Sequence, residues 1–118
     1  MKKAKLPKKF KEKWLKALRS GDFTQARKQL QHKGSHCCLG VACKMSGYSH
    51  QKMGAYGTIT STQFPLIPGV LCSDKDQDYH GIKDRDGGMV SVPDLLMTMN
   101  DTYEDSFDEI ADWVEGNL

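Results

Sequence analysis

Three of the four cysteines fall within the segment His36–Cys43, which reads His-Cys-Cys-Leu-Gly-Val-Ala-Cys. Such a cluster could hold a metal ion or supply a nucleophilic thiolate. Zinc sites usually pair ligands two to four residues apart, with further ligands downstream. Here Cys37 and Cys38 are adjacent, so their side chains diverge, and Cys72 lies far away in an apolar stretch. Because free cysteine behaves as a small hydrophobic residue, the spacing favours buried packing, and we predict no metal ligand.

A cysteine-dependent enzyme is the alternative interpretation of the same segment. It would use Cys37 as the nucleophile, with His36 beside it and His80 as a distant base. A thiol enzyme needs a base within hydrogen-bond reach and a third group that orients this base. Adjacent residues rarely point at each other, and no Asp or Asn is clearly placed to orient either histidine. We therefore assign no catalytic residue and predict no cofactor.

Two other kinds of site are excluded by their spacing. The aspartates at 74–86 suggest calcium, but an EF-hand loop needs Gly at its sixth position and Glu at its twelfth. Counted from Asp74, those positions hold Tyr79 and Arg85, so solvated loop acids are the better explanation. The stretch Gly54–Gly57 lacks both the length and the lysine of a phosphate-binding P-loop.

The elements that position these residues can be predicted from periodicity. Phe10, Trp14 and Leu18 form one apolar stripe of an amphipathic helix over 7–20. A short buried helix is expected over 37–45. Gly40 in its middle weakens the helix by roughly 1 kcal/mol relative to Ala, which indicates that another segment packs closely there.

The second half predicts a small antiparallel sheet and two more helices. Glycines, prolines and a β-prone threonine run at 53–72 favour short strands and loops. Apolar runs around an Asp-Gly turn predict a hairpin near 79–92. A helix is expected over 94–99, ended by Asn100 and Asp101, and a last helix should start at Ser106 with Glu109 completing a capping box. The expected class is α+β.

Charge is distributed unevenly along the 118 residues, although the net charge is +2. Residues 1–34 hold twelve Lys and Arg against two carboxylates, and residues 94–118 hold eight carboxylates and no Lys or Arg. We expect a single domain over 1–118 with residues 1–6 as a flexible basic arm. The basic N-terminal region could bind the phosphates of nucleic acid through Lys2, Lys3, Lys5, Lys8 and Lys9. Alternatively, the two ends could neutralise each other, or subunits could attract head to tail.

The apolar segments predict neither a membrane span nor a secretory leader, because the lysines of 1–13 lead into an amphipathic pattern. Adjacent cysteines without such a leader favour reduced thiols in a cytosol.

The pattern Trp-x-x-Ala-Leu-Arg-Ser-Gly at 14–21, followed by Phe23 and Gln25 and by the cysteine motif at 37–43, resembles a family of short proteins encoded by tailed bacteriophages. The similarity resumes at Leu96–Asp101 and at Ser106–Asp112, whereas 48–90 is only generically similar. The family tends to carry a glycine in the linker where Thr102–Asp105 stands here. The resemblance implies phage origin and a shared fold more than an activity.

From this resemblance we expect a small phage accessory protein that acts by binding in the host cytoplasm. Its role would be host takeover or anti-defence, by sequestering a nucleotide-type immune signal or by blocking a host protein. A homo-oligomer would suit such a role, nucleic acid is the alternative partner, and no membrane is expected. The loop positions expected to bind are Arg19, Phe23, Gln25, Arg85, Asn100 and Asp101. Capping of adjacent helices is the structural alternative for the Arg19–Gln25 turn and for Asn100 and Asp101.

Overall fold

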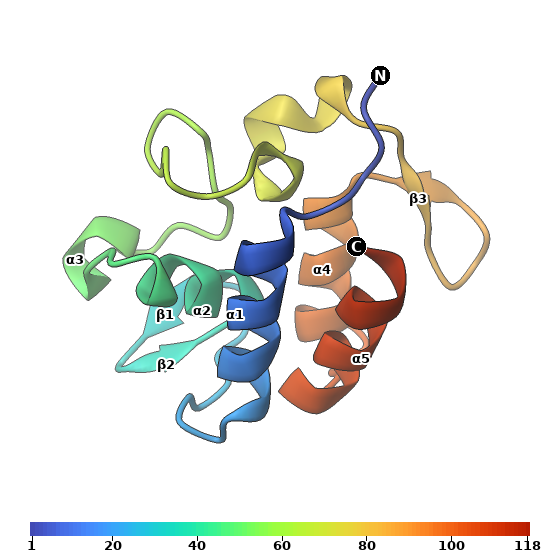
Figure 1. Ribbon diagram of the computed structural model, residues 1–118. Coiled ribbons are helices and arrows are strands. Elements are labelled where there is room, and N and C mark those ends of the chain that lie inside the picture. Colours follow the sequence, from blue (N-terminus) through green and yellow to red (C-terminus); the bar gives the residue numbers. More distant parts are fainter.

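Helices and two short antiparallel hairpins make up the chain, so the predicted α+β class is confirmed (Figure 1). The computed structural model describes all residues from 1 to 118. In chain order the elements are α1 (Lys8–Arg19), β1 (Gln31–His32), β2 (Ser35–His36), α2 (Cys38–Met45), α3 (His50–Met53), the 3-10 helices η1 (Gly69–Leu71) and η2 (Ser73–Asp78), β3 (Ile82–Lys83), β4 (Met89–Val90), α4 (Val92–Asp101) and α5 (Phe107–Asn117).

Helix α1 forms where the apolar stripe predicted it. Trp14, Leu15 and Leu18 are its buried residues, and Pro7 precedes its first turn as N-cap. Gly21 follows with a φ of 78°, a left-handed conformation that glycine adopts without steric cost. The buried face packs against α2 and α5, with α1 in front of α4 in the view of Figure 1.

Helix α2 lies at the centre of the molecule, and its residues Cys38–Cys43 are all buried. The close packing predicted at Gly40 is confirmed, because a Cβ there would lie 1.7 Å from the carbonyl oxygen of Leu30. Leu30 is itself fully buried. The backbone before the first hairpin therefore rests directly on α2, and one core of 27 residues surrounds this contact.

Helices α4 and α5 begin at serine caps. The Ser91 hydroxyl accepts the N–H of Asp94 at 3.3 Å. At Ser106 the hydroxyl accepts the Glu109 N–H at 3.2 Å, while the Glu109 carboxylate accepts the Ser106 N–H at 2.9 Å. The predicted capping box is confirmed. Helix α4 packs against both α2 and α5, so these helices share one core.

The hairpin predicted near 79–92 is present, with strands of two residues each. Ile82 pairs with Val90 and Lys83 with Met89. A second hairpin, β1–β2, was not predicted. Its turn consists of Lys33 and Gly34, whose φ angles of 49° and 84° are both left-handed, as in a type I′ turn.

The strands expected within 53–72 are absent, and that part of the prediction is wrong. The segment consists of turns that lead into η1 and η2. The carbonyl of Ile59 accepts the Ser73 N–H at 2.8 Å, and Ile59 is fully buried. Ile59 of the β-prone run therefore belongs to the core, while no neighbouring strand continues the pairing.

The backbone of the basic arm is hydrogen-bonded to the rest of the fold. The Lys2 N–H donates to the Asp78 carbonyl at 2.8 Å, and the His80 N–H donates to the Lys2 carbonyl at 2.9 Å. Leu6 is buried, and its N–H donates to the carbonyl of Leu118 at 3.0 Å. None of the helices has the length and apolar character needed to cross a membrane.

Candidate functional site

Asn100 is the centre of a buried hydrogen-bond network. Its side-chain oxygen accepts from the N–H of Cys38 at 3.2 Å and from the side-chain amide of Gln25 at 2.9 Å. Its side-chain nitrogen donates to the Ala26 carbonyl at 2.8 Å and to the Asp101 carboxylate at 2.7 Å. Every hydrogen-bonding position of the amide is therefore filled.

This network corrects the expected setting of Asn100. The residue was expected to bind a partner from a loop, but it lies in the last turn of α4 and is fully buried. It ties α4 to the start of α2 and to the segment around Ala26. Burial leaves the Asn100 side chain no free face toward a ligand in this structure.

Gln25 and Asp101 complete the network around Asn100. Besides Asn100, the Gln25 amide donates to the carbonyl of Asp105 at 2.9 Å. The Asp101 carboxylate accepts the backbone N–H of Lys28 at 2.9 Å. The structure thus brings three of the six predicted site residues together. Their side chains form hydrogen bonds with one another and with the backbone.

Phe23 belongs to the same chain segment but packs elsewhere. Its ring meets the edge of His36, with the ring centroids 5.3 Å apart. The His36 imidazole in turn faces His50, with the two Nε2 atoms 3.0 Å apart. His36 is 3% exposed, and its Nδ1 has no hydrogen-bond partner. Phe23 therefore packs against a buried histidine whose partner, His50, is half-buried.

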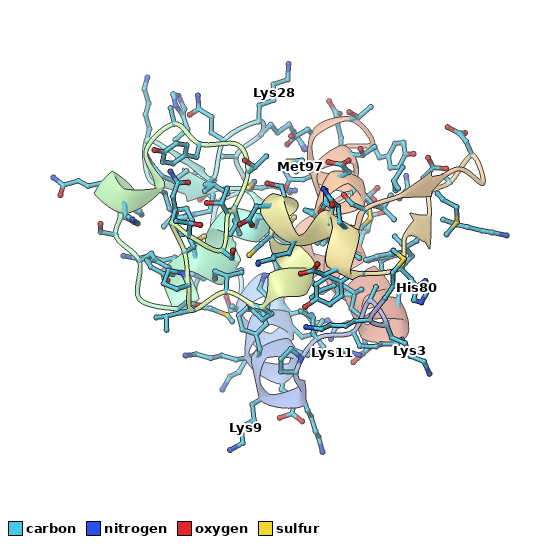
Figure 2. All side chains as sticks on the ribbon, turned by 90° about the horizontal axis from the view of Figure 1, so that it is seen from above. Lys3, Lys9, Lys11, Lys28, His80 and Met97 are labelled. Carbon is cyan, nitrogen blue, oxygen red and sulfur yellow. The ribbon has the colours of Figure 1, made fainter.

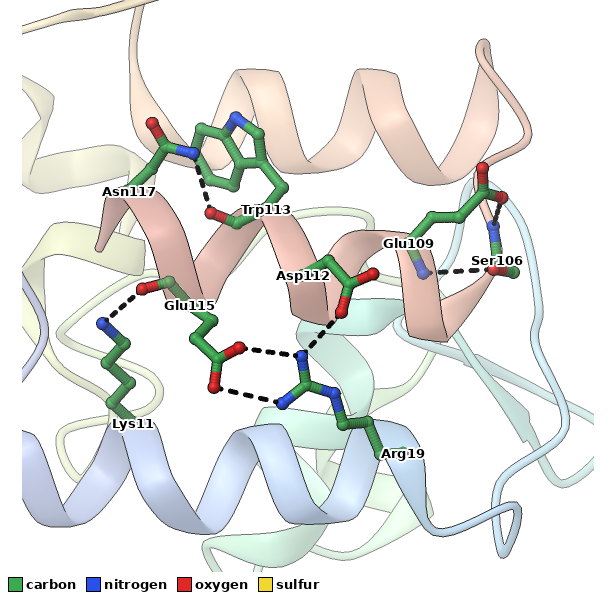
Figure 3. Close-up of polar contacts among 8 residues, drawn as sticks. All are labelled: Lys11, Arg19, Ser106, Glu109, Asp112, Trp113, Glu115 and Asn117. Carbon is green, nitrogen blue, oxygen red and sulfur yellow. Dashed lines mark hydrogen bonds and ion pairs between the residues drawn. The ribbon is translucent and has the colours of Figure 1, made fainter.

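Arg19 lies apart from these residues, at the contact between α1 and α5. Its guanidinium is 2.7 Å from the Asp112 carboxylate and 3.3 Å from that of Glu115 (Figure 3). The basic and acidic ends of the chain are therefore neighbours, as one of the three charge hypotheses predicted. These partners join two helices and occupy the group that was expected to bind a ligand.

Arg85 is the more exposed of the two predicted arginines. It lies in the turn of the β3–β4 hairpin, and its side chain is 56% exposed. The guanidinium pairs with the buried carboxylate of Asp105 and lies 4.1 Å from the ring centroid of Tyr103. An ion pair and a cation–π contact thus fix its orientation while leaving donors free.

A small cavity, here called the hairpin pocket, opens beside Arg85. Its volume is about 150 Å³. Leu95 and Met99 of α4 supply apolar wall, and both are almost fully buried. Its complete lining is Lys83, Asp84, Arg85, Leu95, Met99 and Trp113. An indole and apolar walls with two cations from the hairpin are suited to a flat ligand that carries a negative charge.

A comparison with models of known protein families assigns the chain to a family. A family model described as a domain of unknown function, DUF8296, matches residues 6–118. The chain belongs to the DUF8296 family. No curated protein and no solved structure matches it.

The thiols of this DUF8296 protein are not poised for nucleophilic chemistry. All four are free and buried. Burial raises the pKa of Cys37 to about 11, although its sulfur accepts the Gly40 N–H at 3.4 Å. Burial also raises the pKa of Cys43 to about 12, that of Cys72 to about 11 and that of Cys38 well above its usual range. These groups are thiols at neutral pH, and the cysteines do not converge with histidines or carboxylates into a metal-binding group.

Sequence reasoning predicted only Arg85 among the residues that line the pocket, and Lys83 and Trp113 are among those that it missed. Trp113 lies at the margin of the apolar stripe of α5 and is half-buried. Its indole nitrogen makes no hydrogen bond within the protein, whereas that of Trp14 donates to the Cys38 carbonyl at 3.1 Å. A large aromatic residue at the edge of a helical stripe, close to charged hairpin residues in the fold, was the available signal.

Proposed function

We propose that the protein acts by binding a small nucleotide-like ligand in the hairpin pocket. The observation that carries this proposal is the fixed position of Arg85, held by Asp105 and Tyr103 at the edge of the pocket. In a phage accessory protein of the kind that the sequence resembles, such binding would sequester a nucleotide-type immune signal in the host cytoplasm. The resemblance supports the biological setting, and the pocket supports the ligand class.

The lining provides a separate contact for each part of such a ligand. Trp113 supplies an aromatic wall for a base, and Met99 and Leu95 supply the apolar wall. Arg85 and Lys83 then offer donors to phosphate oxygens, which arginine can bind in a bidentate manner. The Asp84 carboxylate accepts the N–H groups of Asp86 and Gly88, each at 2.9 Å, and so serves the hairpin turn.

The volume limits how the ligand can lie. Pockets for whole drug-sized ligands usually measure roughly 300–1,000 Å³, whereas this one measures about 150 Å³. It therefore takes one ring of the ligand, with the phosphate outside, beside the hairpin. A homo-oligomer would complete the enclosure if two hairpins met around one ligand, and the binding stoichiometry reports this.

The proposal is tested by calorimetric titration with AMP and with cyclic di-adenylate. We expect binding of at least one of them, and roughly tenfold or greater weakening by Lys83→Gln or Trp113→Leu, because each change removes a contact to phosphate or base. Lys75→Gln, which changes an exposed lysine of η2, is the matched control and should bind normally. Arg85→Gln is a weaker choice, because it leaves the buried Asp105 unpaired.

Two results would contradict the proposal. The first is no heat of binding with either nucleotide under low-salt conditions. The second is binding that the pocket variants leave unchanged, which would move the site elsewhere. Blocking of a host protein stays a prediction from the resemblance, and the buried thiols give the cysteine-enzyme alternative no support.

A further inference from the structure

Six of the nine cations in the first twenty residues fall into two sets. The first set faces α5: the Lys5 ammonium donates to the Asn117 carbonyl at 3.1 Å, and the Lys11 ammonium donates to the Glu115 carbonyl at 3.0 Å. Arg19 completes this set through Asp112 and Glu115 (Figure 3). These charges are used within the fold, where they compensate the carboxylates and the carbonyl end of α5.

The second set, here called the lysine face, consists of Lys9, Lys13 and Lys16. Spacings of four and three residues place them on one side of α1, opposite the buried Trp14 and Leu18. All three are exposed, and no ion pair or side-chain hydrogen bond engages them. Figure 2 shows Lys9 pointing away from the rest of the molecule.

We infer that the lysine face binds the phosphate backbone of double-stranded nucleic acid without regard to base sequence. Seven residues at about 1.5 Å rise place Lys9 and Lys16 roughly 10 Å apart along a rigid helix. A DNA duplex carries one charge per ~1.7 Å of its axis, so several phosphates lie within reach of this span. The inference concerns a surface and a partner other than those of the hairpin pocket.

The chemistry of the lysine face argues against other partners. A helix that lies on a membrane needs a free apolar face, but the apolar face of α1 is buried in the core. Protein interfaces are enriched in aromatic residues and arginine and depleted in lysine. The lysine face holds neither an aromatic residue nor an arginine. This composition suits a polyanion with regularly spaced charges, which is bound through its phosphates and not through its bases.

The structure also changes which residues carry this role. Sequence reasoning placed the phosphate contacts on the arm and on the start of α1, at Lys2, Lys3, Lys5, Lys8 and Lys9. The arm is tied down at Lys2, and Lys5 is engaged by α5. The lysine face is preformed, so binding to it costs no ordering of a loose segment.

The experiment measures binding of the full chain to a fluorescent mixed-sequence DNA duplex by anisotropy, over a series of salt concentrations. The native protein should show a steep linear fall of log affinity with log salt. Replacing Lys9, Lys13 and Lys16 together by Gln should reduce this slope by about 2.7, because each lost phosphate contact removes about 0.9. Glutamine retains good helix propensity, so α1 should persist.

Two further variants show whether binding depends on the lysine face or only on the net charge of the protein. A control with Lys33, Lys44 and Lys75 replaced by Gln loses the same charge from exposed positions outside α1 and should retain the native slope. Glu12→Gln removes the one carboxylate of α1 and should strengthen binding. The inference is overturned by absence of duplex binding at low salt, by a flat salt response, or by equal losses in the two triple variants.

Discussion

At the residue scale, Gly40 is a position that leaves no room for a side chain. A Cβ there would meet the Leu30 carbonyl oxygen at 1.7 Å, and both the helix and that backbone are buried. We expect Gly40→Ala to destabilise the protein by about 1–3 kcal/mol or more through overpacking, even though alanine favours helix by ~1 kcal/mol. Urea unfolding measures the change in the free energy of unfolding.

Gly116 provides the matched control for this prediction. It lies in the last turn of α5, and nothing comes within 4 Å of the position its Cβ would take. The same substitution should therefore be neutral or stabilise by up to about 1 kcal/mol. Equal effects at the two glycines would show that α2 does not pack on the backbone of Leu30 as described.

Asn100 supports a second prediction at this scale. Asn100→Ala removes four hydrogen bonds and leaves the buried N–H of Cys38 and carbonyl of Ala26 without these partners. We expect a loss of roughly 3 kcal/mol or more, since each buried unsatisfied group costs about 1–3 kcal/mol. Thr102→Ala, an exposed neighbour, should change stability by less than about 0.5 kcal/mol. A small loss of stability for Asn100→Ala in urea unfolding would contradict the role of Asn100 as the centre of the buried hydrogen-bond network.

The pair of His36 and His50 predicts a pH dependence of stability. Burial lowers the pKa of His36 below its usual value of 6.5, and electrostatic repulsion by His50 and Lys44 lowers it further. The unfolded chain then binds a proton that the folded chain resists, so stability is full above pH 6.5 and falls as the pH drops toward the folded pKa. The urea concentration at the midpoint of unfolding should therefore decrease as the pH is lowered from 7.5 to 5.

His36→Gln tests the origin of this dependence. Glutamine does not titrate, so the variant should lose much of the slope between pH 7.5 and pH 5, whatever its absolute stability. Carboxylates titrate mostly below this range and contribute little to it. An unchanged slope in the variant would assign the effect to other groups.

At the element scale, the contact between α1 and α5 explains how a chain with opposite charges at its ends forms one fold. The two helices lie side by side, and Arg19 meets Asp112 and Glu115 where they pack (Figure 3). Arg19→Glu would place three carboxylates together and should lower the melting temperature. The deficit should shrink in 1 M salt, where exposed charges are screened over about 3 Å.

Arg19→Gln separates loss of attraction from repulsion. It should lower the melting temperature less than Arg19→Glu, because exposed ion pairs contribute little. Equal melting temperatures for all three proteins at low salt would show that the ends do not meet through this residue.

Elements with a strong local signal were predictable, and those that depend on distant partners were not. The apolar stripe of α1 and the capping box at Ser106 and Glu109 are local patterns, and both are present. Ile59 lies in a β-prone run, yet it is buried in a turn because its backbone bonds to Ser73. That outcome depends on a contact across fourteen residues, which local propensity does not contain.

At the scale of the whole molecule, the residues that carry the family resemblance are mainly those that hold the fold. Gln25, Asn100 and the start of the cysteine motif meet in one network, and Trp14 donates to the Cys38 carbonyl at 3.1 Å. The sequence identified these residues but not their meeting, which depends on the packing of α2 against α4. The exposed chemistry lies instead at the hairpin pocket, where Trp113 had no motif to mark it.

Binding of a nucleotide-like ligand in the hairpin pocket is tested most directly by the two indole N–H signals in a nitrogen-15 NMR spectrum. The Trp14 indole is buried and bonded to Cys38, so it serves as an internal control, whereas Trp113 lines the pocket. On titration with AMP or cyclic di-adenylate, the Trp113 signal should shift in a saturable manner while that of Trp14 stays in place. A Trp113 signal that does not move with either nucleotide would contradict the proposed function.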